Sequence, residues 1–319
     1  MPPDGPRLAR EEIPVRATTS LAFVAAIIAG LAGLLDAQGR GGAPGAGRGG
    51  GARGPRAGTV ERITVHGKAL EANREGDSPD RNVTVYLPPS YAEDQARRYP
   101  VLYLLHGYGL RDDAFTGPLA ALAGSADALA PAQGFSEMIV VTPDASTMNK
   151  GNMYSNSPAT GDWERFVAED LVGAIDARYR TLAGRMSRGL GGHAMGGYGA
   201  LRIGMKRPDV FSSLYFMSSC CVAANPSPES MPLEMLEQHA ANLSMYYAVA
   251  MDIGTADSLL ATNRQLHDAM ARLRIAHGYE EYDGDHTNRL QERIARHVLP
   301  FFSKNLAAAA NPSSPPPQR

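Results

Sequence analysis

The chain has 319 residues, of which 44% are hydrophobic and 20% are charged, which is enough apolar material for one large folded domain. Lysine and arginine number 31 against 33 aspartate and glutamate residues, so the formal net charge is −2. This balance gives no global basic field and argues against a nucleic-acid partner.

The first element is an apolar run over residues 21–35, and three arginines precede it. Its length is typical of a signal peptide and short for a membrane span. The residues Leu35, Asp36 and Ala37 form a poor cleavage site, however, so an uncleaved anchor remains the alternative. We expect residues 1–37 to direct export, which makes the protein secreted or periplasmic, with membrane attachment through residues 21–35 if the segment is retained.

Residues 38–58 follow as a segment rich in glycine and arginine. This composition buries too little apolar surface to fold and predicts a flexible linker. Residues 306–319, which end in the sequence NPSSPPPQR, predict a disordered tail. The folded domain is therefore predicted to span residues 59–305.

Within this domain, short β-branched or aromatic runs alternate with helical patterns. The order predicts an α/β fold with a mostly parallel central sheet of about eight strands and helices on both faces. The first two strands are expected to form an antiparallel edge. The predicted strands are 60–65, 82–87, 101–105, 138–142, 188–191, 213–217, 246–251 and 279–282. The predicted helices are 163–179, 195–206, 258–273 and 287–305.

A short glycine-rich turn joins the fifth predicted strand to the second predicted helix. It reads Gly192-His193-Ala194-Met195-Gly196, and its glycine spacing is that of a G-x-S-x-G nucleophile elbow, where a serine lies on a sharp turn with its hydroxyl exposed. The serine position here is Ala194. The scaffold thus predicts a hydrolase, and residue 194 predicts one without its nucleophile. His193, one residue earlier, is expected to point into the fold and pack.

Two later residues complete the chain order of nucleophile, acid and histidine. Asp257 lies in a glycine-containing turn after an apolar strand, and His286 lies between the last strand and the last helix. Because loops at the carboxyl ends of parallel strands meet at one edge, we expect both beside Ala194. Two alternatives remain open: Asp257 is also well placed to cap the helix that follows it, and Asp252 is the rival acid.

Backbone N–H groups that stabilise an oxyanion are expected on both sides of position 194. One is the N–H of Met195, and the other is the N–H of Tyr108, which follows a strand ending in His106 and Gly107. Glycine there lets the backbone approach an ester closely. An ordinary turn between a strand and a helix is the alternative interpretation of this loop.

No metal or cofactor is expected. Asp283, Asp285 and His286 are residue types that ligate metals, but no further ligand cluster has a recognisable spacing. The only cysteines, Cys220 and Cys221, are adjacent, and we expect two free thiols there and not a strained disulfide.

Motifs along residues 80–303 carry a family resemblance. They are RNVTVYLPPSY at 81–91, YLLHG at 103–107, YSNSP at 154–158, IDARYR at 175–180 and MGGYGAL at 195–201. Together they resemble the esterase D/feruloyl esterase group of α/β-hydrolases, which also contains acetylxylan esterases and mycolyltransferases. The resemblance implies an α/β-hydrolase fold. It also implies a serine at position 194, Asp257 as the acid, His286 as the base, and Tyr108 and Met195 as oxyanion donors.

The resemblance further implies a substrate class. Exported members release feruloyl or acetyl groups from plant polysaccharides, so we expect a small or polysaccharide-linked ester, with Tyr108, Asn156 and Trp163 lining its site. For Trp163, the only tryptophan, the alternative is core packing at a helix start. Cytosolic S-formylglutathione hydrolases share the elbow and triad, but they typically have a Cys-containing loop where this chain has Tyr108-Gly109-Leu110.

Two explanations fit Ala194. An engineered Ser→Ala change removes only the nucleophilic oxygen and preserves the pocket, whereas a natural non-catalytic relative keeps the pocket to bind an ester or glycan. The retained acid, base and oxyanion positions favour the engineered change, because a binding protein needs no proton relay. A third hypothesis is acyl transfer to an alcohol, as in mycolyltransferases, but nothing in the sequence indicates a long lipid channel.

Overall fold

The computed structural model describes residues 57–148, 150–219 and 232–307, all within one compact unit, Arg53–Arg319. The expectations for residues 1–37, for nearly all of 38–58 and 306–319, and for the two cysteines fall outside the described ranges. In the part of the chain that is described, no helix is long and apolar enough to cross a bilayer.

The centre of the fold is a mixed sheet of eight described strands in the order β1-β2-β4-β3-β7-β8-β9-β10. Strand β2 pairs antiparallel with β1 and with β4, and all the other pairings are parallel. The predicted α/β class and its antiparallel edge are therefore confirmed. The strands are β1 (Thr59–His66), β2 (Asp80–Leu87), β3 (Val101–Leu105), β4 (Ile139–Pro143), β7 (Arg188–His193), β8 (Ser213–Met217), β9 (Ala248–Gly254) and β10 (Gly278–Tyr282).

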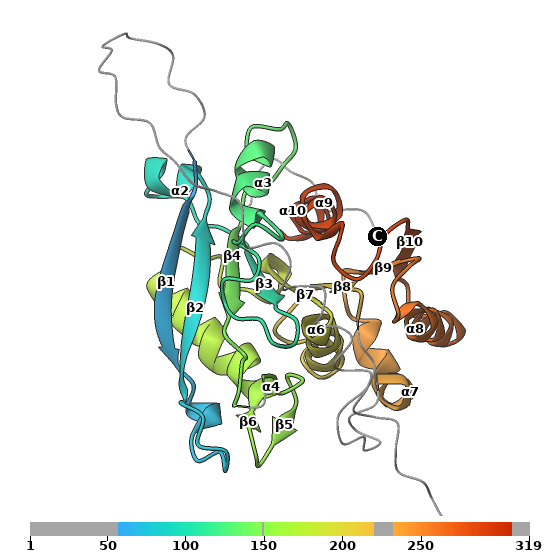
Figure 1. The fold of residues 1–319 in the computed structure, drawn as a ribbon. Helices are drawn as coiled ribbons and strands as arrows, with labels where there is room; N and C mark the ends of the chain where they lie inside the picture. Colours follow the sequence, from blue (N-terminus) through green and yellow to red (C-terminus); the bar gives the residue numbers. More distant parts are fainter. Residues whose placement is uncertain (1–56, 149, 220–231, 308–319) are drawn as a thin grey trace, which may run out of the picture. The chain divides into compact units, whose positions relative to one another are not determined.

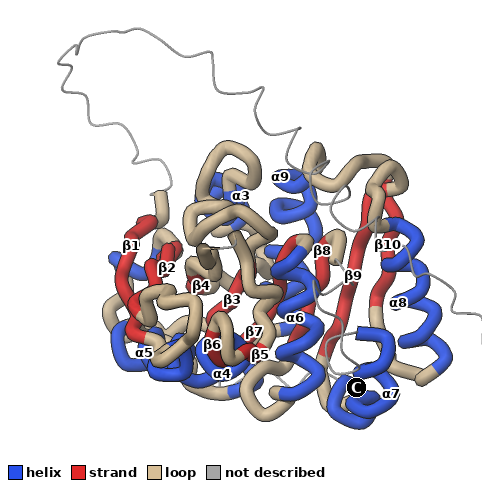
Figure 2. Tube along the Cα trace, turned by 60° about the horizontal axis from the view of Figure 1, so that its bottom comes forward, coloured by secondary structure: helices blue, strands red, loops and turns tan. Residues whose placement is uncertain are grey.

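Helices cover both faces of this sheet (Figures 1 and 2). One face carries α3 (Leu122–Leu129), α9 (Leu290–Arg293), the π-helical turn η5 (Ile294–Val298) and α10 (Leu299–Asn305). The other carries α4 (Trp163–Arg165), the π-helical η2 (Phe166–Leu171), α5 (Val172–Arg178), α6 (Met195–Lys206), α7 (Pro232–Leu243) and α8 (Leu260–Arg272).

Strand β3 shows why both faces must be covered. Its five residues are all buried. Leu102 and Leu104 pack into the core under α10, whereas Val101, Tyr103 and Leu105 pack into the core under α5 and α6. Successive side chains of a strand point to opposite faces, so a continuously apolar strand belongs between two layers of helices.

The remaining described elements are short. They are the 3-10 turns η1 (Lys68–Leu70) and η3 (Arg185–Ser187), the helix α2 (Ser90–Glu93) and a small hairpin of β5 (Asn156–Ser157) and β6 (Gly161–Asp162). Every predicted strand and helix is present, and its ends lie within three residues of the predicted ones. The helices α3 and α7, the short helix α2 and the hairpin of β5 and β6 are not among the predicted elements.

The turn from β7 to α6 has the sharp geometry expected of the elbow. Ala194 has φ 54° and ψ −115°, a backbone conformation that residues with a side chain seldom adopt. Its N–H donates to the carbonyl of Met217 on β8 (3.0 Å), and its carbonyl accepts from the N–H of Tyr198 (3.0 Å). The neighbouring strand and the first turn of α6 thus hold residue 194 in place.

Two glycines allow this turn to close. A Cβ on Gly192 would lie 2.3 Å from the carbonyl carbon of Gly196, and a Cβ on Gly196 would lie 1.9 Å from the carbonyl oxygen of Leu105 on β3. Both contacts are with backbone, which cannot move aside as a side chain can. The start of α6 therefore lies directly against β3 and β7 only because these positions lack side chains.

We predict that Gly196→Ala lowers the free energy of unfolding by about 1–3 kcal/mol, because its methyl group overlaps the backbone of β3. The matched control is Gly173→Ala in α5, where a Cβ meets nothing within 4 Å. This control should stabilise the protein by roughly 0.5–1 kcal/mol, since alanine favours a helix over glycine. Urea unfolding of both variants measures the difference, and equal stabilities would contradict the close approach.

Candidate active site

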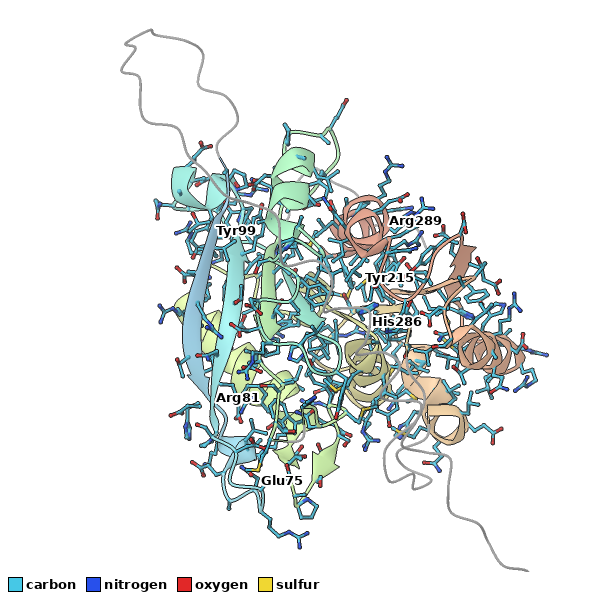
Figure 3. All side chains as sticks on the ribbon, viewed as in Figure 1. Glu75, Arg81, Tyr99, Tyr215, His286 and Arg289 are labelled. Carbon is cyan, nitrogen blue, oxygen red and sulfur yellow. The ribbon has the colours of Figure 1, made fainter. Side chains whose placement is uncertain are left out.

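The predicted acid and base meet at the carboxyl ends of the last two strands. Asp257 follows β9 and His286 follows β10, and His286 Nδ1 lies 2.7 Å from Asp257 Oδ2. The Asp257 side chain is fully buried, whereas that of His286 is 19% exposed. Figure 3 labels His286, and the Nε2 atom of His193, the residue before Ala194, lies 2.8 Å from the His286 carbonyl oxygen. The predicted nucleophile position, acid and histidine, far apart in the sequence, thus lie in one cluster.

Asp257 bonds both the predicted base and the turn that precedes α8. Its Oδ1 accepts a hydrogen bond from the N–H of Leu259 (2.9 Å), while Oδ2 bonds His286. The helix itself begins at Leu260 without a side-chain cap, so Asp257 is not its N-cap residue. Burial by itself raises the pKa of Asp257, but the hydrogen bond and charge of His286, together with the Leu259 N–H, hold that pKa below its ordinary value. The ionised carboxylate therefore keeps the proton of His286 on Nδ1 and leaves Nε2 able to accept one.

The rival acid, Asp252, is committed elsewhere. It is fully buried in β9, where its Oδ2 accepts from Tyr215 Oη (2.8 Å) and Arg293 Nε (2.9 Å). Burial raises the pKa of Asp252 to about 6, against the opposing effect of Arg293. Asp252 anchors the C-terminal helical segment to the sheet and makes no bond to His286.

The loops of the acid and the base are in direct contact. The N–H of Ala256 donates to the carbonyl of Gly284 (2.9 Å), and a Cβ on Gly254 would lie 2.2 Å from that same oxygen. Asp285 Oδ1 accepts from the N–H groups of Thr287 and Asn288, both at 2.8 Å. The sequence places a glycine in the turn before Asp257, but its close contact with Gly284 could not be read from the sequence, because the two positions are 30 residues apart.

His193, expected to pack in the fold, is 4% exposed and contacts His286. Its Nε2 lies 2.8 Å from the carbonyl oxygen of His286, and the two ring centroids are 4.7 Å apart at a tilt of 44°. Burial, with a further contribution from His286, lowers the pKa of His193 to about 3. The ring is therefore neutral at ordinary pH.

The predicted oxyanion loop also reaches the elbow. A Cβ on Gly107 would lie 3.5 Å from the Cβ of Ala194, so the two backbones are close neighbours. The buried His106 orients this loop: its Nδ1 donates to the Gly107 carbonyl and its Nε2 accepts from the N–H of Ala145, both at 2.8 Å. In a trans peptide the N–H points opposite to the carbonyl, so the N–H of Tyr108 points away from His106. No role for His106 follows from the sequence pattern alone.

Side chains of the two predicted oxyanion residues flank one glycine. A Cβ on Gly151 would lie 2.7 Å from both the ring of Tyr108 and the sulfur of Met195. The Tyr108 side chain is 42% exposed, whereas Met195 is buried as the first residue of α6. The N–H of Met195 is therefore at a helix N-terminus, where the backbone N–H groups have no partner within the helix.

The structure places Asn156 in the short strand β5 and Trp163 at the start of α4. Trp163 is 1% exposed, packs edge-on against Tyr154 and Phe166, and donates from Nε1 to the Thr160 carbonyl (2.8 Å). Its indole has no surface to offer a substrate, which corrects the expectation that Trp163 lines the site; its role is the alternative one, core packing. Asn156 is exposed and so remains accessible to a ligand. Its side-chain nitrogen donates to the Glu164 carboxylate, and its side-chain oxygen accepts from the Glu164 N–H.

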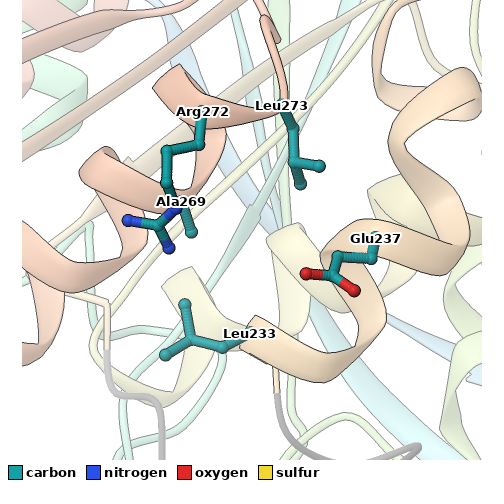
Figure 4. A pocket seen from close by; sticks show the side chains of 5 residues that line it. All are labelled: Leu233, Glu237, Ala269, Arg272 and Leu273. Carbon is teal, nitrogen blue, oxygen red and sulfur yellow. The ribbon is translucent and has the colours of Figure 1, made fainter.

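A separate hollow of about 530 Å³ lies between α7 and α8 (Figure 4). None of the predicted site residues lines it. The lining residues of the hollow are Leu233, Glu237, Ala269, Arg272 and Leu273.

In the described ranges, no three histidine, cysteine, aspartate or glutamate side chains come together as a metal site.

Known structures share this fold. A ferulic acid esterase superposes with a TM-score of 0.68 at 25% identity, over 78% of this chain and 98% of that one. An S-formylglutathione hydrolase of Staphylococcus aureus gives 0.63 at 16% identity, over 78% and 100%. A feruloyl esterase module of Clostridium thermocellum, solved as a Ser→Ala mutant with sinapinate, gives 0.63 at 20% identity, over 82% and 93%. The fold is that of the α/β-hydrolases.

Curated relatives are similar over part of their length. An esterase of Mycobacterium tuberculosis is 32% identical over 178 residues, which cover 54% of this chain and 34% of that protein. An endo-1,4-β-xylanase/feruloyl esterase of Xylanibacter ruminicola is 28% identical over 152 residues, which cover 46% and 21%. The chain thus spans about a third or less of these relatives. A family model described as "Putative esterase" matches residues 78–293, more than half of the chain. The chain belongs to this esterase family.

Proposed function

We propose that this chain carries the active site of a carboxylic-ester hydrolase of the feruloyl or acetyl esterase kind, with Ala194 standing where a serine acts. The observation that carries the proposal is the 2.7 Å bond between His286 and the buried Asp257. An ionised acid that holds one nitrogen of a histidine and frees the other is the proton relay of acyl transfer.

With a serine at position 194, the reaction runs in two steps. His286 Nε2 takes the hydroxyl proton as the serine oxygen attacks the ester carbonyl, and then returns the proton to the leaving alcohol. A water molecule next attacks the acyl-enzyme with the help of the same nitrogen and releases the acid. In both steps the N–H groups of Tyr108 and Met195 stabilise the negative oxygen.

With Ala194, no covalent acyl-enzyme forms at this position, because a methyl group has no lone pair to attack a carbonyl. The acid, the base and the elbow backbone are nevertheless all retained. A proton relay serves no purpose in a protein that only binds a ligand. We therefore infer that the chain is the inactive form of an esterase that differs from the active one by a Ser→Ala change.

The substrate follows from the surface beside position 194 and from the relatives. The exposed ring of Tyr108 offers a flat apolar face to an acyl group, and feruloyl esterases are among both the curated and the structural relatives. An ester linked to a polysaccharide lies outside the cell, which agrees with the export expected from residues 1–37. We propose a short acyl or hydroxycinnamoyl ester as substrate and a secreted location.

We predict that Ala194→Ser raises kcat for a short-chain nitrophenyl ester and for methyl ferulate by a thousandfold or more, since loss of a triad serine costs on the order of a millionfold. Parallel rate measurements on the variant and the unchanged chain test this. The ratio of the two substrates then identifies the preferred acyl group.

The control for this experiment is the double variant Ala194→Ser/His286→Gln, which keeps the serine and removes the base. It should fall back to the rate of the unchanged chain. A folded Ala194→Ser protein that binds methyl ferulate without turning it over would overturn the esterase proposal in favour of a binding protein.

We predict that Asp257→Asn lowers stability by about 1–3 kcal/mol at pH 7, because the buried bond to His286 loses its charged acceptor. The pKa of Asp257 is depressed in the folded state, so its contribution is full above about pH 4 and is lost as the pH falls through the folded pKa. The difference between the two proteins should therefore shrink below about pH 4. Urea unfolding across the acid range measures this, with exposed Asp268→Asn on α8 as control. A difference that stays constant with pH would contradict the assignment.

A further inference from the structure

His193 is a buried polar side chain for which the reaction itself has no use. It ends β7, directly before the elbow, and contacts two other loops of the site. Its Nε2 lies 2.8 Å from the carbonyl oxygen of His286. On its other side, a Cβ on Gly107 would lie 3.7 Å from its Nδ1. One imidazole thus stands between the elbow, the base loop and the oxyanion loop.

The contacts determine the protonation of this ring. A carbonyl oxygen only accepts hydrogen bonds, so Nε2 of His193 must carry the proton and donate it. The ring is 4% exposed, and the neighbouring His286 becomes positively charged whenever it holds a second proton. A second positive charge on His193 at a ring separation of 4.7 Å would oppose that step. The neutral Nε2–H form is the one that both contacts favour.

The backbone carbonyl of His286 accepts this hydrogen bond, so the bond occupies neither nitrogen of the His286 ring. Asp257 fixes the His286 ring at Nδ1, but this single bond leaves the ring free to tilt about it. The bond from His193 fixes the carbonyl of the same residue, and its ring packs against the His286 ring at a tilt of 44°. The side chain and the backbone of the base are then held from two directions.

We propose that His193 is a positioning residue, whose Nε2–H donor ties the base loop to the elbow and sets the orientation of the His286 ring toward position 194. The proposal rests on the proposed function for its catalytic consequence, whereas its structural part applies to the chain as it stands. A displacement of a reacting group by about 1 Å costs on the order of a hundredfold in rate, so a single such bond has a measurable effect.

Two variants separate the donor from the ring. His193→Phe keeps a planar ring of similar size and removes the donor. His193→Gln removes the ring and keeps an N–H that can reach the His286 carbonyl. His239→Phe on α7 is the matched control, because it removes a histidine that no contact links to the site. All three are made in the unchanged chain, with its histidines labelled with ¹⁵N.

The first readout is the NMR signal of the His286 Nδ1 proton, which the short bond to a carboxylate moves far downfield. We expect this signal in the unchanged chain, in His193→Gln and in His239→Phe, and its loss or broadening through exchange with water in His193→Phe. An undiminished signal in His193→Phe, or equal loss in both His193 variants, would overturn the proposal, because the donor would then make no difference.

The second readout adds Ala194→Ser to each variant. We expect His193→Phe to lower kcat tenfold to a hundredfold while KM stays nearly unchanged. His193→Gln should restore most of that kcat. Equal kcat in His193→Phe and His193→Gln would overturn the positioning role. If Ala194→Ser alone is inactive, the proposed function fails, and the NMR comparison still decides the role of His193. If His193→Phe does not fold, His193→Met replaces it as the variant of glutamine's size that lacks a donor.

Discussion

The close approach of the first turn of α6 to β3 is the constraint on which the site depends. No side chain fits between Gly196 and the carbonyl of Leu105, where a Cβ would lie 1.9 Å away. This contact forces the turn before α6 to be sharp and puts Ala194 at φ 54°, a conformation that costs about 1–3 kcal/mol. The sheet and the helix cores on both of its faces supply the stability that offsets this strain. Residue 194 is therefore presented at the edge of the sheet whatever its side chain.

Around this fixed point, three loops converge because parallel strands end at the same edge. The loops of Asp257 and His286 touch at Gly254 and Gly284, and the Asp257 carboxylate bonds the His286 ring. The loop proposed to stabilise the oxyanion is held by a buried histidine of its own, His106. Each loop is thus braced by hydrogen bonds to backbone atoms, which leaves the His286 imidazole as the one polar side chain of the acid–base pair that reaches the surface. Rigid loops around one accessible nitrogen are what proton transfer in a fixed geometry requires.

Much of this arrangement follows from sequence patterns. Apolar runs and glycine spacing located the strands, the elbow and the acid and base loops, because these features depend on local chemistry. The helix α7 was missed although Leu236, Ala240 and Leu243 recur at helical spacing, and α3 lacks a strong pattern because it is rich in alanine. The place of Trp163 could not be decided, since burial of an indole depends on which elements pack over it. The bond from His193 to the base loop joins residues 93 positions apart, and no local pattern encodes it.

The strained turn at Ala194 has a consequence for substitutions at that position. Its backbone is set by glycines and by the neighbouring strand, so alanine and serine experience the same conformation there. The reactive group is therefore set by residue 194, whereas the shape of the turn is set by its glycines and by β8. Adding or removing one side-chain oxygen at position 194 changes none of the residues that shape the turn. A change at residue 194 alone therefore alters the reactive group that the turn presents, while the backbone conformation around it stays as it is.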